Sequence, residues 1–156
     1  MKPIRLEVEG LQSYIEPVVV DFESLGRYGL FGIFGPIGSG KSSLLDALTL
    51  ALYGLVDRVA GRSKKGVINA DAERMEVRLT FSVRTAEGVA ETYEVHRSYR
   101  STSDHSGSGV QRIASRLSQH SDGGVPCEPP LVLADKEREV NDTVAAIVGL
   151  CAEDFM

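Results

Sequence analysis

The sequence has no apolar run long enough to cross a bilayer and no apolar core at its start. Its longest apolar stretch, Leu44 to Leu55, is interrupted by Asp46 and Thr49, whereas a membrane-spanning helix needs about 20 apolar residues. The first ten residues, MKPIRLEVEG, lack the features of a secretory signal. These absences predict a cytoplasmic protein with no membrane partner.

Cysteine pairs and excess positive charge are also missing. Cys127 and Cys151 do not form a C-x-x-C pair, so we expect reduced structural thiols. The 17 basic residues are outnumbered by 22 acidic ones, and the net charge of −5 provides no global field that would attract nucleic acid. Any contact with DNA must therefore come from a local patch. The length of 156 residues and the 42% apolar content predict one globular domain.

The most informative feature that is present is the segment GPIGSGKS, residues 35–42. It matches G-x-x-x-x-G-K-[ST], a loop whose backbone N–H groups surround the phosphates of a nucleotide. The lysine supplies a mobile charge for the β- and γ-oxygens, and the serine hydroxyl is a ligand for Mg²⁺. The motif predicts that ATP or GTP is bound by Gly35, Pro36, Ile37, Gly38, Ser39, Gly40, Lys41 and Ser42.

The surroundings of this loop strengthen the prediction. The run Tyr28–Gly35 is continuously apolar, as expected of a strand that is buried on both faces. A helix is predicted from about Lys41 to Tyr53, with Gly54 as its stop. Because this helix is apolar nearly all round, we expect it to be buried. A strand, the glycine loop and a helix in this order are the context that the motif requires.

The rest of the chain predicts an α/β fold. Alternating patterns indicate strands in several segments, and Ser101–Gly109 has the composition of a mobile loop. A helix is predicted from Asp135, with Gly149 as its cap. The expected architecture is a mixed sheet around the loop and the buried helix, with an antiparallel β-layer over residues 75–120. The expected strands are IRLEVEG, PVVVDF, MEVRLTFSVRT, ETYEVHRSYR, QRIASRLSQH and PPLVLA.

Only half of a catalytic site is visible. The extra glycine at position 38 is typical of ABC-type ATPases, and the absence of an N-K-x-D guanine-binding motif disfavours a GTPase. DHSG (Asp104–Gly107) matches a GTPase switch only by letter. An ABC-type site also needs an apolar strand that ends in Asp-Glu and an LSGGQ signature, and neither is present. Asp21 follows an apolar run but lacks the glutamate, so we interpret it as the end of an ordinary strand.

Three segments resemble one ATPase family. GLQSYIEPVVVDF, LFGIFGPIGSGKSSLLDALTLALYGLVDR and LADKEREVNDTVAAIVGLCAEDF are together similar to the N-terminal ATPase segment of the SbcC family. These proteins are the ATPase subunits of SbcCD DNA-repair nucleases and are related to structural-maintenance-of-chromosomes proteins. The resemblance covers nearly the whole chain except Ser101–Gly109 and its neighbours.

The resemblance implies a fragment of a much longer chain. Residues 1–156 would be the N-terminal lobe of an ATPase head, followed by a glutamine-bearing loop, a coiled coil and a C-terminal half that supplies the missing motifs. The implied partners are this C-terminal half, a second head in a homodimer, an SbcD-like nuclease subunit and DNA. The complete protein would hydrolyse ATP, with Mg²⁺, to gate an exo- or endonuclease, and we expect the fragment alone to be inactive.

The resemblance also assigns residues. Gly35 to Ser43 would form the nucleotide loop, so Ser43 joins the set, with Lys41 on phosphate as the catalytic residue and Ser42 on Mg²⁺. Gln12 and Ser13 fall where relatives place polar residues near the nucleotide. Relatives usually have Thr or Asn at the position of Ile37, which can offer only its backbone. This departure predicts that γ-phosphate sensing is weaker here or is taken over by another residue.

Two alternatives and one patch stay open. The alternatives are a nucleotide-switched DNA clamp or recombination mediator of the RecF or RecN type, and the nucleotide-binding subunit of a transporter. The basic segment Asp57–Gly66 is either a solvated loop or a contact to nucleotide or DNA. Four arginines on predicted strands could line one surface, although DNA binding by this lobe alone should be weak and salt-sensitive. They are Arg97, Arg100, Arg112 and Arg116.

Overall fold

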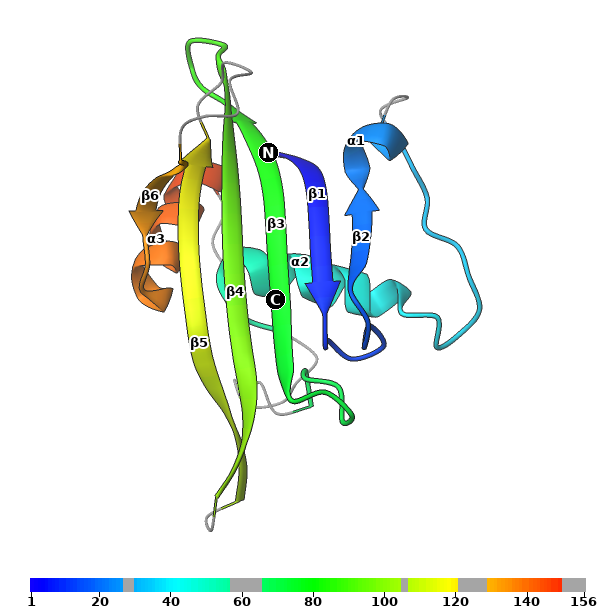
Figure 1. Ribbon diagram of the computed structural model, residues 1–156. Coiled ribbons are helices and arrows are strands. Elements are labelled where there is room, and N and C mark those ends of the chain that lie inside the picture. The colour runs from blue at the N-terminus through cyan, green and yellow to red at the C-terminus, as the bar shows by residue number, and fades with distance from the viewer. Residues whose placement is uncertain (27–29, 57–65, 105–106, 121–128, 150–156) are drawn as a thin grey trace.

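One antiparallel sheet organises the chain. The computed structural model describes residues 1–26, 30–56, 66–104, 107–120 and 129–149. Six strands lie in the order β2-β1-β3-β4-β5-β6, and every neighbouring pair is antiparallel (Figure 1). The strands are β1 (Lys2–Glu9), β2 (Val18–Asp21), β3 (Arg74–Arg84), β4 (Ala90–Asp104), β5 (Gly107–His120) and β6 (Leu131–Ala134).

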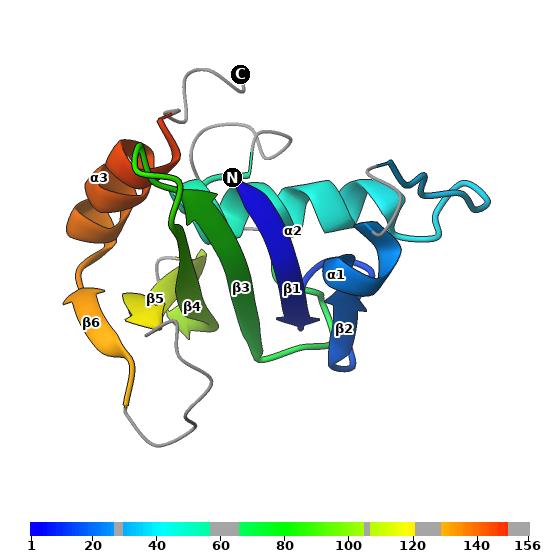
Figure 2. The ribbon, with the colours of Figure 1, turned by 90° about the horizontal axis from the view of Figure 1, so that it is seen from above.

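The helices lie on one face of this sheet. The helices are α1 (Phe22–Leu25), α2 (Lys41–Tyr53) and α3 (Glu137–Val148). Viewed from above, α2 crosses the sheet on the same side as α3, which lies beside β5 and β6 (Figure 2). The core forms between the helices and the sheet, and Leu50 and Ala51 of α2 are fully buried there.

Strict alternation explains why β3 lies where it does. Met75, Val77, Leu79 and Phe81 are fully buried under the helices, while the residues between them point to the other face. A two-residue period gives a strand one apolar and one polar face. The outer face is charged, with ion pairs such as Arg78 to Glu76 at 3.5 Å between Nη2 and Oε1.

The predicted mixed sheet is wrong for the described residues, in which no two strands pair in parallel. The predicted buried strand at Tyr28–Gly35 is also wrong. Residues 27–29 lie outside the described residues, and residues 30–36 form neither strand nor helix. Leu30 is 85% exposed and Phe34 is 93% exposed. An apolar run shows that a segment needs cover, but the described sheet ends at β2 and supplies none.

The predicted loop at Ser101–Gly109 is wrong for residues 101–104 and 107–109, which are strand, while residues 105–106 lie outside the described residues. β4 continues to Asp104 and β5 begins at Gly107, and Ser101 pairs with Val110 across the hairpin. These long strands extend past the end of β3 (Figure 1). Backbone pairing, which is independent of side-chain type, maintains strands through this polar sequence.

Other predictions are confirmed. The helix from Lys41 to Tyr53 has the predicted bounds, and Gly54 ends it in the left-handed conformation, with φ +68°. Gly149 ends α3 in the same way, with φ +75°. The antiparallel β-layer of residues 75–120 corresponds to β3, β4 and β5. Asp21 caps α1, because its Oδ1 accepts the backbone N–H of Glu23 at 3.0 Å.

Candidate nucleotide site

The glycine loop joins the extended segment 30–36 to α2. Gly38 and Gly40 both have φ +85°, which only glycine adopts without strain. The backbone N–H of Ser39 donates to the carbonyl oxygen of Pro36 at 3.3 Å and closes a tight turn. The loop therefore curls back on itself before α2 begins, as a phosphate-binding loop must.

Lys41 lies folded over this loop. Its Nζ donates to the carbonyl oxygens of Gly35 at 2.7 Å and Pro36 at 2.6 Å. A longer contact of 3.3 Å joins the same nitrogen to Oγ of Ser39. These contacts are solvent-exposed, and both main acceptors are neutral carbonyls. An anion that enters the loop would be a stronger acceptor for the same ammonium group.

The start of α2 offers further donors. Gly40 is the N-cap and contributes no side-chain hydrogen bond, so the N–H groups of the first turn lack intrahelical acceptors. The helix dipole adds positive potential at the same end. Ser42 is exposed, whereas the side chain of Ser43 is buried. Ile37 is fully exposed at the tip of the loop.

A second turn packs against this end of α2. Leu11 and Tyr14 exchange backbone hydrogen bonds of 3.0 and 2.7 Å, which leaves Gln12 and Ser13 at the tip. A Cβ atom on Gly40 would lie 3.3 Å from Cβ of Ser13 and 3.2 Å from the ring of Tyr14. The structure thus brings the Gln12–Ser13 turn beside the glycine loop.

The C-terminal end of α2 lies against a buried guanidinium group. Arg97, on β4, is fully buried. Its Nε donates to the carbonyl oxygen of Ala51 at 2.7 Å, and its Nη2 donates to that of Leu52 at 3.0 Å. It also donates to Oγ of Ser115 at 2.9 Å and to Oδ1 of Asn141 at 2.7 Å. One side chain therefore joins α2 to β4, β5 and α3.

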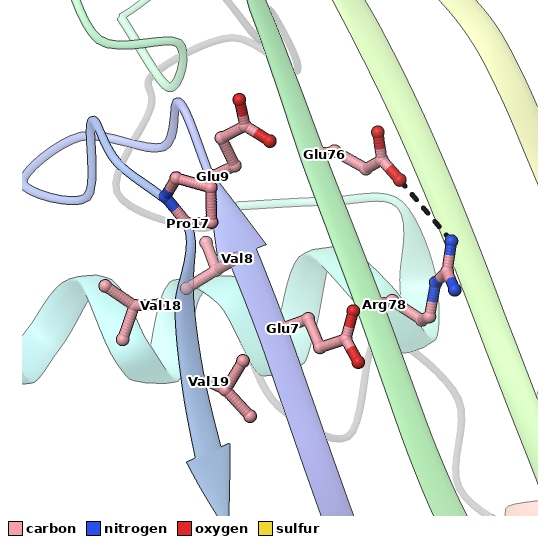
Figure 3. Close-up of a pocket in the computed structure, with 8 residues that line it drawn as sticks. All are labelled: Glu7, Val8, Glu9, Pro17, Val18, Val19, Glu76 and Arg78. Atoms are coloured by element: carbon pink, nitrogen blue, oxygen red, sulfur yellow. Dashed lines mark ion pairs between the residues drawn. The ribbon is translucent and has the colours of Figure 1, made fainter.

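A pocket on the opposite face of the sheet does not suit a nucleotide. It is about 80 Å³ in volume and lies over β1, β2 and β3, away from the glycine loop (Figure 3). Three glutamates line it, Glu7, Glu9 and Glu76, and Arg78 is paired with the last of them at 3.5 Å. Carboxylates in this number would repel a triphosphate.

Comparison with known proteins gives the family. The AAA domain family matches residues 5–142. The chain is 41% identical over 155 residues, or 99% of its length, to the SbcC subunit of the SbcCD nuclease of Bacillus subtilis, and 34% identical over 155 residues to that of Clostridium acetobutylicum. It is also 38% identical over 118 residues, or 75% of its length, to a probable DNA double-strand break repair Rad50 ATPase of Aquifex aeolicus.

The chain belongs to the AAA domain family. Within it, the chain is a homologue of SbcC, and the resemblance drawn from the three sequence segments is confirmed. The chain spans 13%, 12% and 11% of the lengths of these three relatives, so it corresponds to about an eighth of an SbcC-type protein.

Sequence patterns did not reveal the contacts that two residues of this SbcC homologue make: Tyr14 lies against Gly40, and Arg97 lies against the end of α2. The predicted surface role of Arg97 is wrong, because it is buried. The alternation of β4 carried the signal, since Arg97 lies in phase with Val95 and Tyr99 on the inward face. Burial lowers the pKa of Arg97, and the nearby Tyr99 and Glu137 oppose this shift.

The other basic residues singled out in the sequence are either exposed or outside the described residues. Arg100, Arg112 and Arg116 are exposed. Residues 57–65 of the predicted basic segment lie outside the described residues, as do Cys127 and Cys151.

Within the described part of the chain, no group of three His, Cys, Asp or Glu residues is arranged to hold a metal ion. No helix there is long and apolar enough to cross a membrane.

Proposed function

We propose that residues 1–156 form the N-terminal lobe of an ABC-type ATPase head of the SbcC kind and that its glycine loop binds ATP. The observation that carries this proposal is the position of the Lys41 ammonium group. It lies over the carbonyl oxygens of Gly35 and Pro36 beside the N-terminus of α2. A triphosphate that displaces these neutral acceptors gains a charge-assisted hydrogen bond and meets the positive end of a helix at the same place.

Each residue of the loop has a proposed task. The backbone N–H groups of Gly35 and of residues 37–41 hold the phosphates, and the Lys41 side chain neutralises charge on the β- and γ-oxygens as the terminal bond breaks. Ile37 contributes only its backbone, because its side chain extends into solvent. Ser43 contributes its N–H group, since its hydroxyl is buried. Ser13 lies beside Gly40, and Gln12, which precedes it in the same turn, is the second polar side chain proposed to lie near the nucleotide.

Mg²⁺ would be held here by Ser42. This hydroxyl is exposed at the first turn of α2, and it fits a cation that uses few protein ligands and keeps several waters. When bound, the ion neutralises phosphate charge. With the ion bound, Lys41 is still the side chain proposed to orient the phosphates.

A C-terminal ATPase half is the proposed partner of the exposed apolar surface. Leu30, Phe34 and Ile37 precede α2 or lie in the loop, and Leu45 is 57% exposed on α2 itself. Large apolar side chains gathered in this way mark an interaction surface. The small share of each relative that the chain covers supports a covering segment from the same protein.

The complete protein would dimerise through its heads, hydrolyse ATP and gate a nuclease subunit that acts on DNA in the cytoplasm. Two relatives are named as subunits of a nuclease and a third as a DNA double-strand break repair ATPase, which supports this assignment. The same names favour it over a mediator of the RecF or RecN type and over a transporter subunit.

The test uses the complete protein with its nuclease subunit. We expect Lys41→Ala to weaken ATP binding by about 100-fold, measured by calorimetry, and to abolish ATP-dependent cleavage of DNA. Lys136→Ala, which removes an exposed lysine bonded to Glu139 at the start of α3, is the matched control and should change neither. Unaltered ATP binding by Lys41→Ala would contradict the proposal. Separately, Lys41-dependent ATP hydrolysis by residues 1–156 alone would contradict the proposal that the C-terminal half supplies the rest of the catalytic site.

A further inference from the structure

A tyrosine hydroxyl holds the glycine at which α2 begins. Oη of Tyr14 donates to the carbonyl oxygen of Gly40 at 3.0 Å, across 26 residues of sequence. The ring packs where a side chain at Gly40 would lie, because a Cβ atom there would be 3.2 Å from both Cζ and Oη. Gly40 is therefore fixed from outside its own loop.

This hydrogen bond determines where the next N–H group points. The carbonyl of Gly40 and the N–H of Lys41 belong to one planar trans peptide unit, so they point in opposite directions. The same oxygen also accepts the backbone N–H of Leu44 at 3.0 Å. Two donors on one carbonyl restrict rotation of the peptide unit and keep the Lys41 N–H aimed away from them.

Tyr14 is itself held by a third segment. Its turn is bound through the backbone N–H of Gln12, which donates to the carbonyl oxygen of Val67 at 2.9 Å. Asn69 donates from its side chain to the carbonyl oxygen of Gln12, and its N–H bonds to Gly10 at 2.8 Å. Burial raises the pKa of Tyr14, so its hydroxyl remains a donor. Hydrogen bonds to Val67 and Asn69 therefore hold the turn that carries Tyr14.

We propose that Tyr14 is a positioning residue for the nucleotide loop, acting through the Gly40–Lys41 peptide unit without touching the nucleotide. The inference rests on the proposed function. Backbone N–H groups of this loop type hold the inner phosphates, which ATP and ADP share. If the Lys41 N–H group no longer points at them, the affinity for ATP and the affinity for ADP should fall equally. The rate at which the terminal phosphate bond breaks should stay unchanged at saturating ATP.

The experiment compares Tyr14→Phe with Tyr93→Phe in the complete protein. Tyr93 is a matched control, since its hydroxyl also makes one hydrogen bond, to Glu91 at 2.5 Å, but on β4. For Tyr14→Phe we expect the Kd values for ATP and ADP to rise by the same factor, about five-fold. We expect kcat at saturating ATP and the melting temperature without nucleotide to stay at wild-type values. Tyr93→Phe should bind both nucleotides like the wild type.

Three results would overturn the inference. The first is wild-type affinity in Tyr14→Phe, and the second is a lower kcat with unchanged Kd, which would place the hydroxyl at the reacting phosphate. The third is an equal loss of affinity in Tyr93→Phe, which would attribute the effect to general stability. Lys41→Ala is measured alongside, because nucleotide binding that does not depend on Lys41 contradicts the proposed function, whereas Lys41-dependent binding with an inert Tyr14→Phe contradicts only this inference.

Discussion

The two ends of α2 use the same chemistry in opposite surroundings. At each end, one cationic side chain donates to two successive backbone carbonyls. Lys41 does so at Gly35 and Pro36, in contact with solvent. Arg97 does so at Ala51 and Leu52, where it is fully buried. The first arrangement can exchange its acceptors for a ligand, and the second cannot.

The choice of side chain follows this difference. A lysine ammonium group is a compact charge on a flexible stem, which suits a group that must move between loop carbonyls and phosphate. The guanidinium of Arg97 is a rigid fork that reaches α2, Ser115 and Asn141 at once. Arginine also stays charged when buried. We infer that the buried end fixes the helix so that the exposed end is free to bind a ligand.

The largest expected effect is the loss of the buried cation. Arg97→Ala should lower the local stability of α2 by about 3 to 5 kcal/mol, because it leaves several buried acceptors without donors. Hydrogen exchange of peptides covering residues 50–56, in the complete protein, measures this loss. Arg100→Ala on the same strand removes an exposed guanidinium and should leave the exchange within about 0.5 kcal/mol of wild type. Unchanged exchange in Arg97→Ala would show that the buried cation is not needed to hold the C-terminal end of α2.

The second effect is at the exposed end and is on binding alone. Lys41→Ala should weaken ATP binding by about 100-fold, the value of a hydrogen bond to a charged group. Exchange of residues 50–56 should stay at the wild-type level, since the contacts that are lost are exposed. A marked loss of protection in Lys41→Ala would mean that the exposed cation also maintains the helix, and the contrast between the two ends would disappear.

The sequence was sufficient for what local periodicity determines. The bounds of α2 follow from the glycines at 40 and 54 and from the apolar residues between them. The alternation of residues 75–84, 91–100 and 111–120 predicts three strands, although β4 and β5 extend further, to Asp104 and from Gly107. In each case the decisive signal lies within about 15 residues of the element that it predicts.

What sequence could not supply is the identity of distant partners. The apolar segment Tyr28–Gly35 was expected to be a buried strand, but an apolar run does not say which segment covers it. Arg97 lies in phase with apolar neighbours, yet its acceptors are on α2 and α3, 44 to 46 residues away. Tyr14 reaches Gly40 across 26 residues. Such contacts depend on how the elements pack and leave no periodic trace.

The third and smallest effect separates two glycines of similar backbone conformation. Gly54 has φ +68°, and a Cβ there would lie 3.1 Å from both Nη1 of Arg97 and Oε1 of Glu137. Gly38 has φ +85° in open space. Alanine costs about 1 to 2 kcal/mol at either position for the left-handed backbone alone. Gly54→Ala must in addition displace the buried guanidinium.

These two alanine variants test whether the buried end is closely packed. We expect Gly54→Ala to lower the protection of residues 50–56 by about 1 kcal/mol more than the backbone term. Gly38→Ala should leave that protection unchanged and weaken ATP binding, because it acts only within the glycine loop. A loss of protection in Gly54→Ala no larger than the backbone term would mean that Arg97 and Glu137 can move aside, and that the C-terminal end of α2 is not closely packed.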